Sequence, residues 1–84
     1  MSNITKWIIN WFVENCGQDE AEITNHLDNS YFENGYIDSF QFINMISDAE
    51  DEFDIVFDNN QFEDRSFSTI NGLSSIIEGM IAHE

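Results

Sequence analysis

The serine at position 39 is the residue of this chain whose surroundings point most clearly to chemistry. It lies in the segment 36–40, Tyr-Ile-Asp-Ser-Phe, directly after a glycine and before an amphipathic run that ends at Phe53. This position predicts a hydroxyl where a helix begins, outside the core and open to other proteins. The local pattern therefore indicates a serine that is modified or bound, and not one that performs chemistry itself.

Two other roles for this serine compete with modification. As a nucleophile, Ser39 would need a positioned base. His26 is the one candidate before it, and the chain has neither a third orienting residue nor an oxyanion-loop signature. As an N-cap, Ser39 would only stabilise its helix, by about 1 kcal/mol. The sequence predicts no catalytic residues and no enzyme, and the capping role remains open.

The acidic run at 48–52 raises the question of a metal site. Asp48, Glu50 and Glu52 alternate as calcium ligands can, but an EF-hand loop needs glycine at its sixth position and glutamate at its twelfth. Counting from Asp48, these positions hold Phe53 and Asn59. His26 and His83 have no cysteine or second histidine at ligand spacing, and both are expected at the surface. No specific metal site is predicted.

Composition limits the class of protein. The 84 residues predict a single domain, 1–84, and the 42% hydrophobic content is enough for one core. Seventeen acids stand against Lys6 and Arg65 alone, a net charge of −15. Such a chain repels nucleic acid and anionic membranes and attracts basic protein faces. With one cysteine, Cys16, and no signal peptide or membrane span in the pattern, we expect a cytoplasmic monomer.

Helical periodicity predicts three substantial helices, at 3–15, at 39–53 and from Ser68 or Thr69 onward. A short helix that reaches Asp64 is also predicted, with Asn59 or Asn60 as its N-cap. The segment 18–37 is interpreted as a long loop with one helical turn, and 55–57 as an extended loop. Gly72 and Gly79 are expected to weaken the last helix by about 1 kcal/mol each.

The predicted fold is an all-α, small four-helix bundle. The inward faces are predicted to consist of Ile4, Trp7, Ile8, Trp11 and Phe12; of Phe42, Ile46, Ala49 and Phe53, widened by Ile43 and Met45; and of Ile70, Leu73, Ile77, Met80 and Ile81.

The helix-opening triplet 38–40, Asp-Ser-Phe, stands fourteen residues before the phenylalanine that ends the acidic run 50–53. An Ile-Val pair follows at 55–56, and the segment 67–73 resembles the start of a last helix. This combination resembles the acyl carrier protein family over nearly the whole chain. The resemblance implies that a phosphopantetheinyl transferase attaches 4′-phosphopantetheine from coenzyme A to Ser39. The arm's thiol would then carry an acyl or aminoacyl group as a thioester, and a helix N-terminus suits the phosphodiester anion.

The sequence departs from the common fatty-acid pattern around this serine. Gly35 stands three residues before the aspartate instead of two, Phe40 replaces leucine, and Gln41 and Asn44 occupy positions where fatty-acid carriers often have acids. The spacing is closer to D-alanyl carriers and to carriers of dedicated lipid or polyketide pathways. A dedicated loading ligase and a downstream acyltransferase or synthase are therefore expected as partners. An unmodified acidic interaction domain of the same fold is the alternative. The residues expected to dock partners are Asp38, Phe40, Gln41, Asn44 and Asp48.

Overall fold

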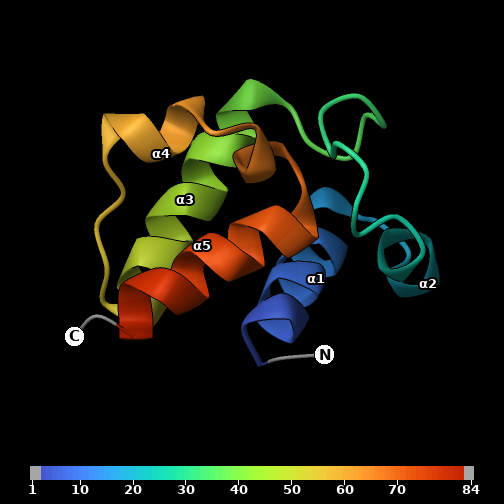
Figure 1. Cartoon of the computed structure of the whole chain (residues 1–84). Coiled ribbons are helices and arrows are strands. Elements are labelled where there is room, and N and C mark those ends of the chain that lie inside the picture. Colours follow the sequence, from blue (N-terminus) through green and yellow to red (C-terminus); the bar gives the residue numbers. More distant parts are fainter. Residues whose placement is uncertain (1–2, 83–84) are drawn as a thin grey trace.

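The computed structural model, which describes residues 3–82 apart from the side chains of Asn59 and Ala82, consists of helices joined by loops (Figure 1). Within that range no strand forms, and the one β-bridge joins Ser30 to Thr69. The predicted all-α class is confirmed. The elements, in chain order, are α1 (Asn3–Cys16), α2 (Glu20–Thr24), α3 (Ser39–Phe53), α4 (Asn59–Glu63), the 3₁₀ helix η1 (Arg65–Ser68) and α5 (Ile70–Ala82).

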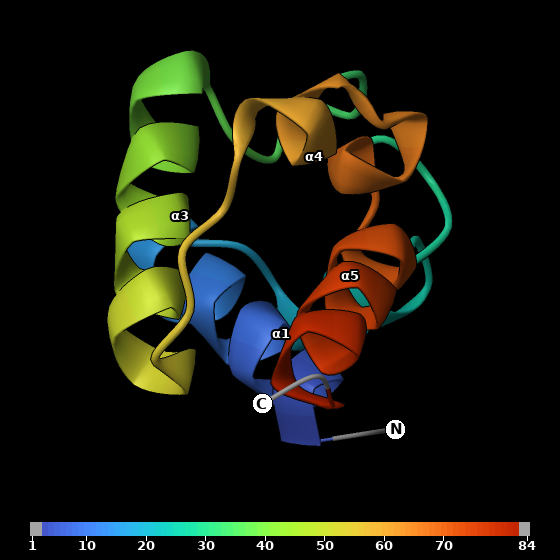
Figure 2. The same cartoon turned by 60° about the vertical axis from the view of Figure 1, so that its left-hand side comes forward.

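The three long helices α1, α3 and α5 enclose the core, and α4 with η1 lies across the end where α3 begins (Figures 1 and 2). Helices α1 and α5 are joined inside the core by a hydrogen bond of 2.7 Å between the hydroxyls of Thr5 and Ser74. None of the helices in residues 3–82 has the length and apolar content needed to cross a membrane. The most deeply buried large side chains are Ile8, Phe12, Ile23, Tyr31, Met45, Ile70, Leu73 and Ile77.

Helix α3 has the predicted bounds, but its buried face is rotated from the predicted one. Met45 is fully buried, together with Ile46 and Ala49, whereas Ile43 is 66% exposed. The prediction that Ile43 widens the inward face is therefore wrong. Phe42 and Phe53 are only partly buried and pack against the edge of the core. The helix ends at Phe53, and its C-cap, Asp54, adopts the left-handed conformation (φ 54°).

The other long helices agree with their patterns except at single positions. In α1, Ile9 is buried although it lay outside the predicted stripe, while Ile4 and Trp7 are only partly buried. In α5, Ile81 is 37% exposed, which corrects its assignment to the inner face. In the extended loop after α3, Ile55 and Phe57 are buried and Val56 is exposed, so the predicted packing of this loop on the helices is confirmed.

Aspartates begin most of the helices. Asp19, Asp38, Asp58 and Asp64 are the N-caps of α2, α3, α4 and η1. The expectation that Asn59 or Asn60 caps the short helix is wrong, because the cap is the residue before them. Each carboxylate accepts a hydrogen bond from a backbone N–H of the first turn, which a helix otherwise leaves unsatisfied. Part of the acidity of this chain therefore has a structural function.

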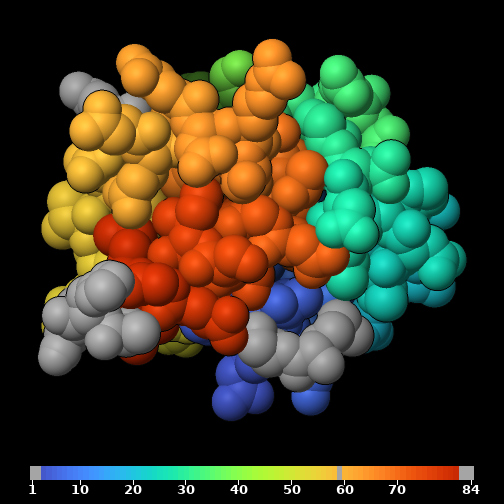
Figure 3. All heavy atoms as spheres, viewed as in Figure 1, coloured from blue at the N-terminus to red at the C-terminus, as the bar shows by residue number. Residues whose placement is uncertain are grey.

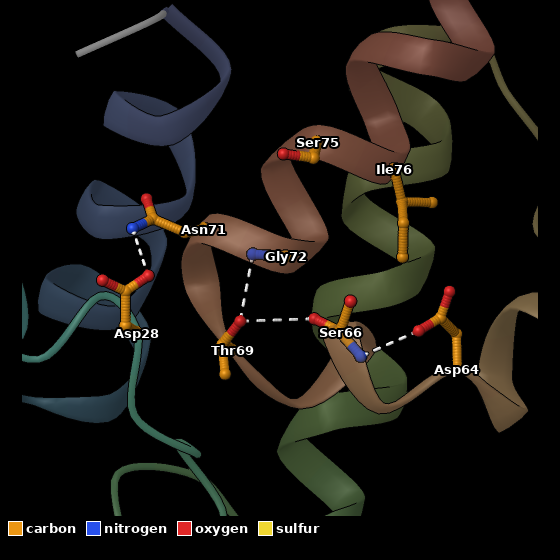
Figure 4. A pocket seen from close by; sticks show the side chains of 8 residues that line it. All are labelled: Asp28, Asp64, Ser66, Thr69, Asn71, Gly72, Ser75 and Ile76. Carbon is orange, nitrogen blue, oxygen red and sulfur yellow. Dashed lines mark hydrogen bonds between the residues drawn. The ribbon is translucent and has the colours of Figure 1, made fainter.

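The long loop before α3 is docked onto the junction of η1 and α5. The Tyr31 N–H donates to the Ser68 carbonyl at 3.0 Å, and the Tyr31 hydroxyl donates to the Phe67 carbonyl. Burial raises the pKa of Tyr31 far above its ordinary value, so the ring stays neutral. Asn71 donates twice, from its N–H to the Leu27 carbonyl at 3.0 Å and from its amide to Asp28 at 2.7 Å (Figure 4). These contacts fix a segment that looks irregular in sequence.

The position of Phe53 sets a stability prediction. Its ring meets Trp7 edge to face with centroids 5.3 Å apart, at the rim of the core. We expect Phe53→Ala to cost about 1.5–2.5 kcal/mol, about half the usual value for a fully buried phenylalanine. Urea denaturation beside Phe12→Ala, which removes a ring that is 0% exposed, provides the comparison. Equal losses for the two variants would contradict the rim position.

Candidate functional site

Ser39 is the first residue of α3, and its side chain is exposed. The residue that caps the helix is Asp38: its carboxylate accepts from the Gln41 N–H at 2.8 Å, and the Gln41 side chain accepts from the Asp38 N–H at 3.2 Å. The alternative in which Ser39 is only an N-cap is therefore wrong. Because Asp38 satisfies the helix end, the Ser39 hydroxyl is not needed for capping and is left available.

The turn that leads into this helix is anchored by buried side chains. Gly35 adopts a positive φ of 74°, and the next two side chains, Tyr36 and Ile37, are buried. Glycine tolerates such a φ best because it has no Cβ. The Tyr36 hydroxyl donates to Glu22 at 2.9 Å. Burial first, and then the hydrogen bond and charge of Glu22, raise the pKa of Tyr36. The backbone just before Asp38 is therefore anchored, and Ser39 is presented from a fixed base.

The side-chain contacts of His26 are with Glu22, Asn29 and Tyr36, and not with Ser39. Its ring faces Glu22 across 3.6 Å and Asn29 across 3.4 Å. His83, the other histidine, lies outside the described residues.

Beneath the first turn of α3 lies a cluster of aromatic rings that the sequence pattern did not predict. Phe42, on that turn, has ring neighbours from the loop before α3, from α4 and from η1, at centroid distances of 5.1–6.4 Å. These neighbours are Tyr31, Phe32, Phe62 and Phe67. Interlocked rings of this kind pack as a rigid unit. The sign of this cluster in the sequence was the number of phenylalanines, eight in the chain.

The outward face of α3 begins with large apolar side chains. Phe40 is 76% exposed and Ile43 is 66% exposed. They lie one turn apart, so they share the same helix face. Asn44, also exposed, adjoins them. Ile43 belongs to this face although the periodicity had assigned it to the core. The start of α3 therefore exposes an apolar surface, formed by Phe40 and Ile43, beside Ser39.

The remaining residues expected to dock partners are engaged within the chain. Asp38 and Gln41 hold each other in the capping box. Asp48 accepts a hydrogen bond of 2.7 Å from the indole Nε1 of Trp11. Asp38 and Asp48 are nevertheless exposed, as are Phe40 and Asn44. The contribution of all five residues to docking stays a prediction.

Cys16, at the end of α1, is half-buried. Burial, and then the charge of Asp38, raise the pKa of this thiol. The thiol is therefore not an activated nucleophile. Over the described range 3–82, the His, Cys, Asp and Glu side chains form no group of three or more that could hold a metal ion.

The geometry suits a covalent anionic group on Ser39. The primary hydroxyl is exposed at the start of a 15-residue helix, so another enzyme can reach it without disturbing the core. The first N–H groups of such a helix favour the negative charge of a phosphodiester.

Comparison with known proteins agrees with this chemistry. A family model described as a phosphopantetheine attachment site matches residues 6–77, most of the chain. A search of curated proteins and a search of solved structures each found no match. The matched range includes the start of α3, the loops on either side and most of α5. The chain therefore belongs to the phosphopantetheine attachment family, whose domains bind 4′-phosphopantetheine covalently and serve as carriers without catalytic activity of their own.

Proposed function

We propose that Ser39 is the attachment residue and that the whole chain is one cytoplasmic, monomeric carrier domain. In the attachment step a transferase forms a bond between the Ser39 oxygen and the phosphorus of the pantetheine phosphate. The diphosphate bond of coenzyme A breaks, the nucleotide part leaves, and the serine proton passes to the transferase. The arm supplies a terminal thiol that carries an acyl or aminoacyl group as a thioester.

One observation carries this assignment: the hydroxyl of Ser39 is exposed at the first position of α3, while Asp38 performs the capping. The anchored turn before it supports the same conclusion, because a transferase needs the serine in a reproducible place. The aromatic cluster under Phe42 supports the first turn from inside.

We further propose that the partners belong to a dedicated pathway and not to housekeeping fatty-acid synthesis. The exposed Phe40 and Ile43 provide an apolar contact next to Ser39. Gln41 and Asn44 provide no charge where a basic synthase enzyme would need one. Apolar contact with few ion pairs favours partners whose own docking face is apolar.

The test starts by incubating the chain with a phosphopantetheinyl transferase and coenzyme A and measuring the intact mass. One arm per chain is expected, and no adduct would favour the alternative of an unmodified acidic domain. The modified protein is then offered to a purified adenylating ligase and to fatty-acid synthase enzymes. We expect the ligase to load the carrier faster than the synthase enzymes do. Efficient loading by the synthase enzymes would contradict the dedicated pathway.

A charge-gain variant sharpens this comparison. Gln41→Glu with Asn44→Glu adds the two missing acids, and glutamate at position 41 keeps the capping box because it accepts the same hydrogen bond. Loading by the synthase enzymes should rise in this variant, while loading by the ligase should stay the same or fall. The matched control is Asn10→Glu with Ser75→Glu, which adds two acids at exposed positions on α1 and α5 and changes the net charge by the same amount.

A further inference from the structure

The sequence contains two Asn-Gly pairs, at 34–35 and at 71–72, and the fold places them in different surroundings. In this dipeptide the backbone nitrogen of the glycine is able to attack the Cγ atom of the asparagine, because glycine has no Cβ to hinder the approach. The product is a five-membered succinimide ring, which closes only where the backbone between the two residues is free to rotate. The local structure therefore decides whether each pair reacts.

The first pair lies in the loop between α2 and α3, at the tip of a turn (Figure 1). The tip residues, 32–35, are all exposed, whereas Tyr31 and Tyr36 on either side are buried. The Gly35 N–H donates to the Phe32 carbonyl at 3.2 Å, and the Tyr36 N–H closes the base of the turn on the Tyr31 carbonyl at 3.0 Å. Opening the tip breaks one exposed hydrogen bond while the base stays closed, so its free-energy cost is low.

The side-chain amide of Asn34 is not held by the rest of the fold. Over residues 3–82 neither its oxygen nor its nitrogen has a hydrogen-bond partner, and the residue is exposed. Only the backbone of Asn34 is engaged, through its N–H, which donates to the Ser30 carbonyl at 3.1 Å. The Cγ atom is therefore free to turn toward the Gly35 nitrogen when the tip opens.

The second pair is held at each of the corresponding groups. The Asn71 N–H donates to the Leu27 carbonyl at 3.0 Å, and the Asn71 amide donates to Asp28 at 2.7 Å. The Gly72 N–H donates to the Thr69 hydroxyl at 3.0 Å (Figure 4). Ring closure here would break these bonds and the first turn of α5, so this pair is protected in the folded chain.

We propose that Asn34 converts spontaneously to isoaspartate in the folded chain, and that this conversion loosens the turn that presents Ser39. The Gly35 nitrogen bonds to the Asn34 Cγ atom and gives up its proton, the bond from Cγ to Nδ2 breaks, and ammonia leaves with that proton. Water then opens the ring. Opening at the former backbone carbonyl gives isoaspartate, and opening at Cγ gives aspartate. An asparagine and a water molecule thus become an acidic residue and ammonia.

Isoaspartate changes the path of the backbone and not only the charge. The main chain at position 34 then runs through the Cβ and Cγ atoms and is one carbon longer. The extra carbon lies between Tyr31 and Tyr36, the buried residues whose backbones close the base of the turn. A transferase needs the Ser39 hydroxyl in a reproducible place, so a lengthened turn should slow the attachment of the arm. This consequence rests on the proposed function, whereas the conversion of Asn34 does not.

Trypsin separates the two pairs, because the chain has one lysine and one arginine, Lys6 and Arg65. Fragment 7–65 carries Asn34, and fragment 66–84 carries Asn71. The full chain is kept at mildly alkaline pH and body temperature and is then digested. The fragments are treated with an isoaspartyl methyltransferase and labelled S-adenosylmethionine, which marks isoaspartate.

We expect fragment 7–65 from the folded chain to take up at least about tenfold more label than fragment 66–84. The matched control is Asn34→Gln, whose longer side chain would have to close a six-membered ring, and fragment 7–65 of this variant should stay unlabelled. When the chain is kept in urea instead, fragment 66–84 should also be labelled, because the helix that protects Asn71 is lost. Equal label on both fragments of the folded chain, or label that persists in Asn34→Gln, would overturn the proposal.

The effect on Ser39 is measured with a phosphopantetheinyl transferase and coenzyme A. The converted chain, separated from the intact chain by its additional charge, should accept the arm several-fold more slowly. Asn34→Asp has the same charge and a normal backbone, so it should be modified at nearly the wild-type rate. Equal rates for the converted and the intact chain would refute the effect on the turn. If the intact chain accepts no arm, the proposed function fails, while the label on fragment 7–65 still decides whether Asn34 converts.

Discussion

Ser39→Ala is expected to accept no phosphopantetheine arm, while the wild-type chain is converted fully by the same transferase and coenzyme A. The substitution removes the one oxygen that can form the phosphate ester at the start of α3. The cap belongs to Asp38, so the helix end stays satisfied. Alanine also suits a first helical turn, and the substitution should therefore change the free energy of unfolding by less than about 0.5 kcal/mol. Intact mass after incubation and urea denaturation provide the two measurements.

The matched control is Ser47→Ala, which removes an exposed hydroxyl two turns further along α3. This variant should be modified at the wild-type rate, because the hydroxyl that it loses does not lie at the start of the helix. A second variant, Asp38→Asn, keeps a capping side chain but removes its charge, and it should remain modified if Asp38 acts mainly on the helix. An equal adduct on Ser39→Ala and on the wild type would refute the assignment of the site.

The long helices and the serine position could be predicted from the sequence because both depend on local patterns. The bounds of α3 follow from an aspartate cap and from apolar periodicity, and the structure shows the same first and last residues, Ser39 and Phe53. Thr69 caps α5, as expected, since its hydroxyl accepts from the Gly72 N–H at 3.0 Å. Family membership rests on the same features.

The exposure of single side chains could not be read from periodicity alone. Met45 and Ile43 lie two positions apart on α3, and the pattern assigned both to the inward face, although only Met45 is buried. Which side chain faces the core depends on contacts with other elements, such as those of Phe42 with the rings of Phe62 in α4 and Phe67 in η1. Contacts between segments so distant in sequence carry no local signal.

The roles of the acids were also hidden in the sequence. A run of carboxylates looks like a uniform docking surface, yet Asp38 caps α3 and Asp48 holds an indole. Glu50 accepts from the Phe57 N–H at 3.0 Å and ties down the extended loop. The net charge could be predicted from the sequence. Which carboxylates accept hydrogen bonds within the chain, and which remain open to solvent, could be seen only in the structure.

Gly72→Ala is expected to destabilise the protein by about 3 kcal/mol or more, the opposite of what helix propensity alone predicts. A Cβ at this position would lie 2.0 Å from the Ser66 carbonyl oxygen. That atom belongs to the backbone of η1, which rests directly on α5 (Figures 3 and 4). To relieve the overlap, η1 would have to move, together with Phe67, which packs under Phe42. Urea or thermal unfolding measures the loss.

Gly79 provides the matched control within the same helix. No atom lies within 4 Å of a Cβ built there. Gly79→Ala should therefore stabilise the protein by about 0.5–1 kcal/mol through helix propensity. The two substitutions are chemically identical, and the difference between them isolates the contact between η1 and α5. Stabilisation by both would show that η1 does not press on α5. It would also remove the reason to regard the support beneath the first turn of α3 as rigid, since Phe67 reaches Phe42 from that same segment.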